Sequence, residues 1–186
     1  MADEWPRITR RVMNRVSLWV KLIEREVEFA PGAAPEIYHS VSTSDHVCVL
    51  AVTPDGRIPL VRQYRPALEG FTLELPAGMI DKDEAPAMTA GRELLEETGF
   101  PAIKVHALGV HSTDSGRLGS RTHSYFAETA GRMRGFEPEA GVVPQLVSPA
   151  ELLDLVFSGE FSVQAQLGTL FLAVQRGHLK LPNRAR

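Results

Sequence analysis

The chain contains Gly78-Met-Ile-Asp-Lys-Asp-Glu84 and, after seven intervening residues, Arg92-Glu-Leu-Leu-Glu-Glu-Thr-Gly-Phe100, and this segment carries its most specific pattern. Its glutamates Glu93, Glu96 and Glu97 stand at i, i+3 and i+4, so a helix would carry them on one face. Neighbouring carboxylates repel one another, and a divalent cation would relieve that repulsion. Hard oxygen ligands favour Mg²⁺, with Mn²⁺ able to substitute, over zinc. A solvated acidic helix face is the alternative, and the three glutamates alone do not exclude it.

Helices are predicted at three places. The first should follow Asp83 as N-cap, tolerate Pro86 in its first turn and end at Gly99, which suits a left-handed C-cap. A second should begin at the capping box 148–151, where serine precedes proline and glutamate stands three residues later. A third is indicated by helical spacing of apolar residues over 162–176.

Strands are predicted where apolar residues alternate with polar ones or are β-branched. These stretches are 16–29 (one or two strands), 36–41, 46–52, 58–64, 105–110 and 121–127. The segment 129–141 carries four glycine or proline breaks and is expected to be a mobile loop. Hairpins together with separate helices favour the α+β class over a repeating βαβ chain.

The overall composition excludes several classes of protein. The chain is 44% hydrophobic and 23% charged, as in a soluble globular protein. A net charge of -3 gives no bulk attraction to nucleic acid or to an anionic membrane. No apolar run approaches the roughly 18 residues of a membrane span, and the N-terminus lacks the apolar region of a signal peptide, so a cytoplasmic protein is expected. The single cysteine, Cys48, lies in an apolar run and is expected to be a buried structural thiol.

The complete spacing resembles the Nudix box, which reads glycine, five residues, glutamate, seven residues, then Arg-Glu-apolar-x-Glu-Glu-x-Gly-apolar. Every fixed position of that pattern is filled, and Leu94 and Phe100 occupy its two apolar positions. The resemblance implies the Nudix fold, an α/β/α sandwich with a mixed sheet. It also implies a small N-terminal strand subdomain over 1–43, serving dimerisation and base stacking, before a Nudix hydrolase domain over 44–186.

The same resemblance implies a reaction and its residues. Water would attack a diphosphate linked to a second moiety, with Mg²⁺ neutralising charge and lowering the pKa of the water. The implied metal ligands are Glu93, Glu96, Glu97 and the backbone carbonyl of Ala77. The implied supporting residues are Gly78, Glu84 and Arg92, of which Glu84 and Arg92 would pair.

Residues outside the box resemble the branch that hydrolyses ADP-ribose and other nucleoside diphosphate sugars. The resemblance rests on 61–65, on 73–78, on Leu18-Trp-Val-Lys-Leu22 and on Ile37-Tyr-His-Ser-Val41. It implies a homodimer with four substrate contacts. Trp19 and Tyr38 would stack on the base, Arg65 would contact phosphate, and Arg117 would contact phosphate or sugar. Some ADP-ribose enzymes carry an arginine shortly after the second aromatic, where this chain has serine and threonine over 42–44.

The general base is open among three glutamates. Relatives often use a glutamate from a late loop, where Glu139 is preferred over Glu137 because it stands nearer the following strand. The third possibility is Glu96 of the box itself, acting without a loop residue.

The substrate class also has alternatives. The preferred hypothesis is cleavage of a nucleoside diphosphate sugar, such as ADP-ribose, ADP-glucose or GDP-mannose, into a nucleoside monophosphate and a sugar phosphate. A nucleoside triphosphate or dinucleotide polyphosphate hydrolase is the second hypothesis. A non-catalytic nucleotide sensor is the third, and the intact box argues against it.

Overall fold

A computed structural model describes residues 5–183. In chain order its elements are β1 (Arg7–Arg15), β2 (Lys21–Glu28), β3 (Glu36–Ser42), β4 (His46–Val52), β5 (Ile58–Arg65), the short 3-10 helix Pro66–Leu68, β6 (Gly70–Glu74), β7 (Ala77–Met79), α1 (Pro86–Thr98), β8 (Ala102–Ser112), β9 (Arg121–Thr129), β10 (Val142–Val147), α2 (Pro149–Ser158) and α3 (Gln164–Gln175).

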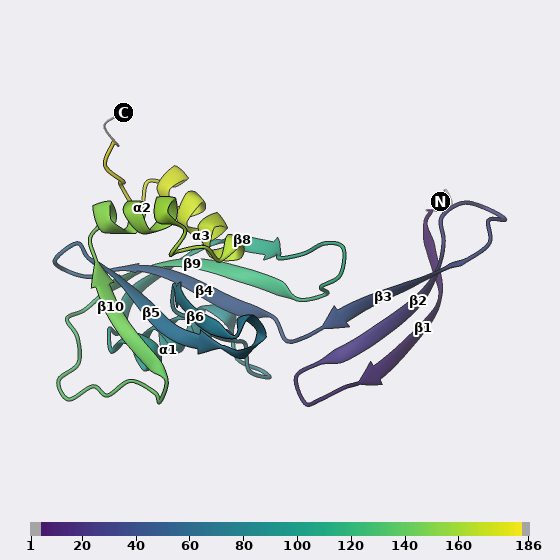
Figure 1. Ribbon diagram of the computed structural model, residues 1–186, viewed down its shortest axis with the longest axis horizontal. Coiled ribbons are helices and arrows are strands. Elements are labelled where there is room, and N and C mark those ends of the chain that lie inside the picture. Colours follow the sequence, from purple (N-terminus) through teal and green to yellow (C-terminus); the bar gives the residue numbers. More distant parts are fainter. Residues whose placement is uncertain (1–4, 184–186) are drawn as a thin grey trace. The chain divides into compact units, whose positions relative to one another are not determined.

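The chain forms two compact units. The smaller consists of Met1–Ser44 and Ser112–Arg121, and the larger of Asp45–His111 and Thr122–Arg186. Figure 1 shows the elements of each unit along the chain. In the part of the chain that the structure describes, no helix is both long enough and apolar enough to cross a membrane.

The smaller unit is an antiparallel sheet with the order β1-β2-β3. Its edge strand β3 is extended by the segment 112–121, because Val41 donates from N to the Arg117 carbonyl (2.8 Å) and accepts from Gly119 N (2.9 Å). The N-terminal subdomain predicted over 1–43 therefore falls in a unit that includes a distant segment. Those backbone bonds join residues almost eighty positions apart, and such pairings leave no periodic pattern in a sequence.

The larger unit contains two sheets. One is antiparallel with the order β10-β5-β6, and the other has the order β7-β4-β9-β8. In the second sheet β4 runs antiparallel to β7 and parallel to β9, so the sheet is mixed as predicted.

Strand β4 lies at the centre of the larger unit, and helices cover both of its faces. Because side chains alternate along a strand, Val47, Val49 and Ala51 share one face. They pack with Ala90 and Leu94 of α1. A fully buried β-branched run of this kind is typical of a strand covered on both sides.

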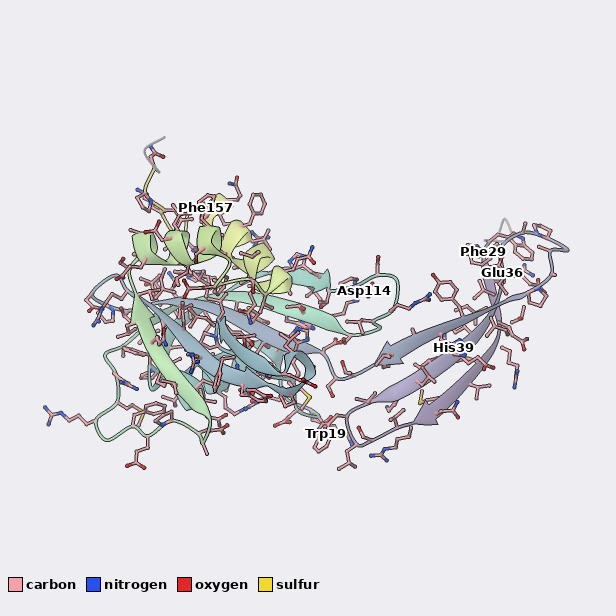
Figure 2. The ribbon with its side chains drawn as sticks, viewed as in Figure 1. Trp19, Phe29, Glu36, His39, Asp114 and Phe157 are labelled. Carbon is pink, nitrogen blue, oxygen red and sulfur yellow. The ribbon has the colours of Figure 1, made fainter. Side chains whose placement is uncertain are left out.

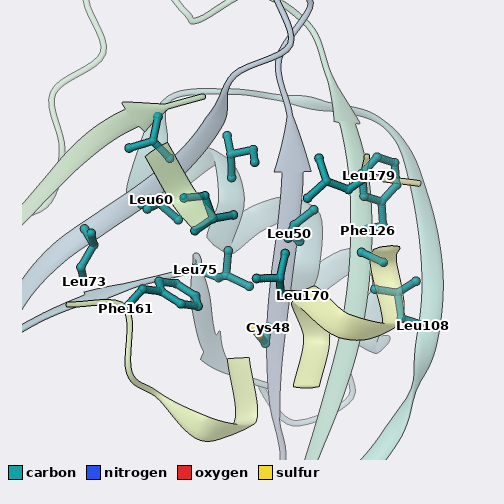
Figure 3. Packing of buried hydrophobic residues seen from close by; sticks show 14 residues of the cluster. Cys48, Leu50, Leu60, Leu73, Leu75, Leu108, Phe126, Phe161, Leu170 and Leu179 are labelled. Carbon is teal, nitrogen blue, oxygen red and sulfur yellow. The ribbon is translucent and has the colours of Figure 1, made fainter. Parts of the chain in front are cut away.

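The opposite face of β4 packs on the two C-terminal helices. Cys48 and Leu50 belong to one cluster with Leu152 of α2, Leu170 of α3 and Phe161 from the connection between them (Figure 3). Burial raises the pKa of the Cys48 thiol to about 12, which fits the predicted structural thiol rather than a nucleophile. Helices on both faces of the sheet confirm the α/β/α sandwich and the α+β class (Figure 1).

Helix α1 has the predicted C-terminus but not the predicted N-cap. Pro86 takes the first helical position, and Gly99 caps the end with φ of 77°. The N-cap is Ala85, whose side chain makes no cap hydrogen bond, so the prediction of Asp83 was wrong. Asp83 has φ of 69° and lies in the turn that Glu84 N closes onto the Asp81 carbonyl, 3.1 Å away. The Glu84 side chain accepts hydrogen bonds from Thr89 and Arg92 of α1, so the turn that contains Asp83 precedes the helix.

The other helices follow their sequence signals. Helix α2 begins at the capping box, with Ser148 accepting from Glu151 N and Glu151 accepting from Ser148 N. Helix α3 lies inside the predicted range and ends before Gly177. Strands β1, β6 and β7 were not predicted, and residues 16–20 of the predicted segment 16–29 form the connection between β1 and β2. Proline and glycine interrupt the short segment that forms β6 and β7.

Two glycines of the larger unit allow backbone and packing effects to be separated. Gly168 is exposed within α3, with nothing within 4 Å of a Cβ added there. We expect Gly168→Ala to raise the free energy of unfolding by about 1 kcal/mol through helix propensity. Gly159 also has open space, but its φ is 82°, so Gly159→Ala should lower that free energy by about 1–2 kcal/mol. Urea denaturation measures the free energy of unfolding of both variants. Changes of the same sign and size would contradict the explanation that the backbone conformation, rather than packing, sets the two effects apart.

Candidate active site

An ion pair joins the loop before α1 to the helix. Arg92 donates from Nε and Nη2 to the two carboxylate oxygens of Glu84, at 3.1 and 2.9 Å. Thr89 Oγ1 donates to the same carboxylate at 2.8 Å. Hydrogen bonds from Arg92 and then Thr89 lower the pKa of Glu84, so this carboxyl is ionised at neutral pH. A bidentate contact also fixes the plane of the guanidinium.

The same guanidinium contacts two more carboxylates. Arg92 Nη1 donates to Glu93 Oε1 at 2.8 Å and to Glu96 Oε2 at 2.9 Å. Its hydrogen bond to Glu84 is the largest of several causes that raise the pKa of Arg92. One positive charge thus faces three negative ones, and the cluster keeps an excess of negative charge.

Gly78 of β7 lies directly against the Glu93 carboxylate. A Cβ added to Gly78 would stand 2.0 Å from Glu93 Cδ and 2.1 Å from Oε1. Any side chain at this position would therefore displace the carboxylate. Glycine at the start of the box allows the backbone of β7 to approach this side chain of α1.

Glu97 is the most buried of the three box glutamates on α1. It is 7% exposed and accepts a hydrogen bond from Ala77 N to Oε2 at 3.0 Å. Burial, opposed by the Ala77 hydrogen bond and aided by the charge of Glu93, raises the pKa of Glu97 to about 7. The backbone of Ala77 and Gly78 thus lies along the glutamate face of α1.

The box glutamates have the donor chemistry of a site for a hard divalent cation. Burial raises the pKa of Glu93 as well as that of Glu97, so both ionised forms are held at a cost that a cation would offset. Within residues 5–183 no group of three or more His, Cys, Asp or Glu side chains is arranged to hold a metal ion. Arg92 holds Glu93 and Glu96 instead, so the metal-ligand roles of the box glutamates and Ala77 stay predictions.

Arg65, predicted to contact substrate, is held by a carboxylate that the sequence did not single out. Its Nε and Nη2 donate to the two oxygens of Glu74 at 2.7 and 2.6 Å. The Arg65 side chain is 41% exposed, whereas that of Glu74 is 5% exposed. Burial alone would raise the pKa of Glu74, but hydrogen bonds from Arg65 and Thr72 outweigh it and the pKa is lowered.

Helix α3 completes this network. Gln166 donates from Nε2 to Glu74 Oε2 at 3.2 Å and accepts from Leu75 N at 2.7 Å. Gln166 is itself only 4% exposed, and these two hydrogen bonds satisfy both the nitrogen and the oxygen of its buried side-chain amide. The only sequence signal for Glu74 was a charged residue between two leucines of a buried segment.

The two loop glutamates lie between β9 and β10 and are exposed. The negative charge of Glu139 adds to the burial that raises the pKa of Glu93. The choice among Glu139, Glu137 and Glu96 as general base stays a prediction.

Three of the predicted substrate contacts lie in the smaller unit. Arg117 places its guanidinium 4.8 Å from the ring centroid of Tyr38 and donates from Nη1 to the His39 carbonyl at 3.3 Å. Trp19 lies in the turn between β1 and β2, where its side chain is 59% exposed (Figure 2). The structure therefore brings Tyr38 and Arg117 together as a cation–π pair, which sequence reasoning treated as separate contacts.

Comparison with known proteins places the chain in a family. The NUDIX domain model matches residues 43–170. The chain is 39% identical over 108 residues to an ADP-ribose pyrophosphatase of Bacillus subtilis (strain 168), covering 58% of this chain and 51% of that protein. It is 31% identical over 142 residues to an ADP-ribose pyrophosphatase of Mycobacterium tuberculosis, covering 74% of this chain and 69% of the relative. The chain spans about half the length of several curated relatives that it matches, including the Bacillus subtilis protein.

The fold has a solved counterpart. A crystal structure of an ADP compounds hydrolase superposes with a TM-score of 0.76, covering 94% of this chain and 96% of that chain at 23% identity. At that identity the likeness establishes the fold. Because the domain model matches most of the chain, and the Mycobacterium tuberculosis relative is matched over two thirds of its own length, the chain belongs to the NUDIX domain family.

Proposed function

We propose that this chain is a Mg²⁺-dependent pyrophosphatase that hydrolyses the diphosphate of nucleoside diphosphate sugars of the ADP-ribose, ADP-glucose or GDP-mannose type. The products would be a nucleoside monophosphate and a sugar phosphate. The observation that carries the proposal is a pair of carboxylates, the half-buried Glu93 and the buried Glu97, set against the glycine-containing backbone of β7. Members of the family generally use divalent metal ions, and the relatives named above are ADP-ribose pyrophosphatases.

The residues of the box have distinct proposed roles. Glu93, Glu96, Glu97 and the Ala77 carbonyl would hold Mg²⁺, with Mn²⁺ able to substitute. When bound, the metal would neutralise charge on the diphosphate and lower the pKa of the attacking water. Gly78, Glu84 and Arg92 support this arrangement through the contacts described above.

The hydrolytic step needs a base and a clear route for the proton. The water oxygen forms a bond to one phosphorus, and the bond from that phosphorus to the bridging oxygen breaks. We assign the proton to Glu139, which stands nearer to β10 than Glu137 does, ahead of Glu137 and Glu96. A carboxylate in a loop is free of the hydrogen bonds with which Arg92 engages Glu96.

Four residues are proposed to select the substrate. Arg65 would contact the diphosphate with a guanidinium whose orientation Glu74 fixes. Trp19 and Tyr38 would stack on the base, and Arg117 would contact phosphate or sugar. In this proposal the protein is a cytoplasmic homodimer in which residues 1–43 serve dimerisation and base stacking.

The function is tested by incubating the purified chain with ADP-ribose and Mg²⁺. We expect AMP and ribose 5-phosphate in equal amounts, and no turnover once EDTA removes the metal. A panel of ADP-glucose, GDP-mannose, nucleoside triphosphates and dinucleotide polyphosphates then ranks substrates by kcat/KM. Binding of ADP-ribose without AMP release would refute the hydrolase and favour a sensor, and preference for triphosphates would refute the substrate class.

Glu97→Gln tests the buried carboxylate. Glutamine keeps an acceptor for Ala77 N but removes the negative charge, so turnover should fall at least about 100-fold with little change in thermal stability. Asp154→Asn, which removes an exposed charge on α2, is the matched control and should keep normal turnover. Near-normal turnover by the Glu97 variant would refute its role in holding the metal.

Glu74→Gln tests the network that holds Arg65. At pH 7 we expect the free energy of unfolding to fall by about 1–3 kcal/mol, because a buried acceptor of several hydrogen bonds is replaced by an amide. The folded pKa of Glu74 is lowered, so its contribution is complete above the unfolded value, about 4.3, and is lost as pH falls through the folded value. The difference between wild type and variant should therefore shrink in acid.

Urea denaturation at pH 7 and at several lower pH values measures this difference. Asp55→Asn is the control, because Asp55 is an exposed carboxylate whose pKa is also lowered, by hydrogen bonds to Thr53 and Arg57. Its effect should be much smaller at every pH. A Glu74→Gln difference that stays constant between neutral pH and acid would contradict the assignment.

A further inference from the structure

The loop 130–141 is attached to the C-terminal end of α1. Arg132 donates from Nε to the Thr98 carbonyl at 3.1 Å, and Met133 N donates to the Gly99 carbonyl at 2.9 Å. The last carbonyls of a helix have no partner within the helix, and a cation beside them interacts favourably with the helix dipole. The loop therefore supplies hydrogen-bond donors and a positive charge to the last carbonyls of α1.

A phenylalanine adds a steric contact at the same place. Phe136 lies over Gly99, where an added Cβ would stand 2.5 Å from Phe136 Cγ. Arg132 places Cζ 5.2 Å from the centroid of the Phe136 ring, within cation–π range. Gly99 thus serves both the left-handed C-cap and the space that Phe136 occupies. We call Arg132, Met133 and Phe136 with their partners Thr98 and Gly99 the loop clamp.

Glu139 lies between two fixed points. Phe136 is held on α1, and Val142 N donates to the Glu139 carbonyl at 3.1 Å where β10 begins to pair with β5. Only two residues separate Phe136 from Glu139 on the first side, so the clamp limits where the carboxylate can reach.

We propose that Arg132 and Phe136 are positioning residues that fasten the loop 130–141 to the end of α1 and thereby limit the positions that the Glu139 carboxylate can take for hydrolysis. This proposal rests on the proposed function. It explains why the box helix ends in a glycine that meets an aromatic ring.

Steady-state kinetics with ADP-ribose and Mg²⁺ test the clamp. Phe136→Ala and Arg132→Met should each lower kcat about 10- to 100-fold, the scale expected when a reacting group is misplaced by about 1 Å. KM should change less than about 3-fold, because neither residue is assigned to substrate binding. Phe136→Tyr and Arg132→Lys should restore most of kcat, since they keep the ring and the cation.

The matched control is Arg134→Ala in the same loop. Arg134 is exposed, and the described part of the chain gives it no hydrogen bond or ion pair. Its loss should leave kcat within about 2-fold of wild type. A fall in kcat as large as that of Arg132→Met would overturn the proposal, because general loss of positive charge would then explain both.

A double-mutant cycle shows whether the clamp acts through Glu139. Glu139→Gln should slow turnover about 100-fold or more, and single-turnover assays with radiolabelled ADP-ribose keep this rate measurable. Adding Phe136→Ala to it should then cost less than about 3-fold. Wild-type turnover by Glu139→Gln, or a Phe136→Ala effect of unchanged size in that background, would overturn the proposal.

Amide hydrogen exchange separates failure of the clamp from failure of the proposed function. In the wild-type chain without substrate, the Met133 N–H should be protected, and Phe136→Ala should speed its exchange at least about 10-fold while β4 amides are unchanged. If ADP-ribose is not hydrolysed at all, the proposed function fails, and the assignment of Glu139 fails with it. In that case only the exchange rate of the Met133 N–H tests whether the loop is fastened to α1. An unprotected Met133 N–H in the wild-type chain would overturn the fastening.

Discussion

The ion pairs of the Arg92 guanidinium hold the other charged residues of the box in place. The guanidinium receives one carboxylate from the loop before α1, Glu84, and two from the helix, Glu93 and Glu96. A planar donor with five N–H groups can satisfy several carboxylates at once, whereas an ammonium could not hold the bidentate contact. The ion pair thereby fixes the loop and orients two glutamates, while leaving the cluster with net negative charge.

Excess negative charge at a half-buried site destabilises a fold, and the hydrophobic core of the larger unit offsets this destabilisation. Alternating residues of β4 pack against α1 on one face and against α2 and α3 on the other. Helix α1 is consequently held by an apolar face while its glutamate face meets the backbone of β7. The hydrophobic core thus helps to hold Glu97 within hydrogen-bond distance of Ala77 N, and this hydrogen bond opposes the rise in pKa that burial causes.

Much of this arrangement could be predicted from local sequence. Periodicity and β-branched runs identified most strands, and the capping box at 148–151 fixed the start of α2. The box spacing identified the family and the pairing of Glu84 with Arg92. What could not be predicted depends on contacts distant in sequence. Glu74 meets a glutamine of α3 ninety-two positions later, and the segment 112–121 joins the edge of β3.

The two glycines of the box have a shared physical explanation. Gly78 leaves room for the Glu93 carboxylate, and Gly99 leaves room for Phe136. One contact fixes the glutamate face of α1 to a strand, and the other fixes the end of α1 to a loop. Their separation along the chain must then match the length of the intervening turn and helix, because a residue added within α1 would rotate the glutamates by about 100°. The spacing of the motif is therefore a requirement of geometry at both ends of one helix.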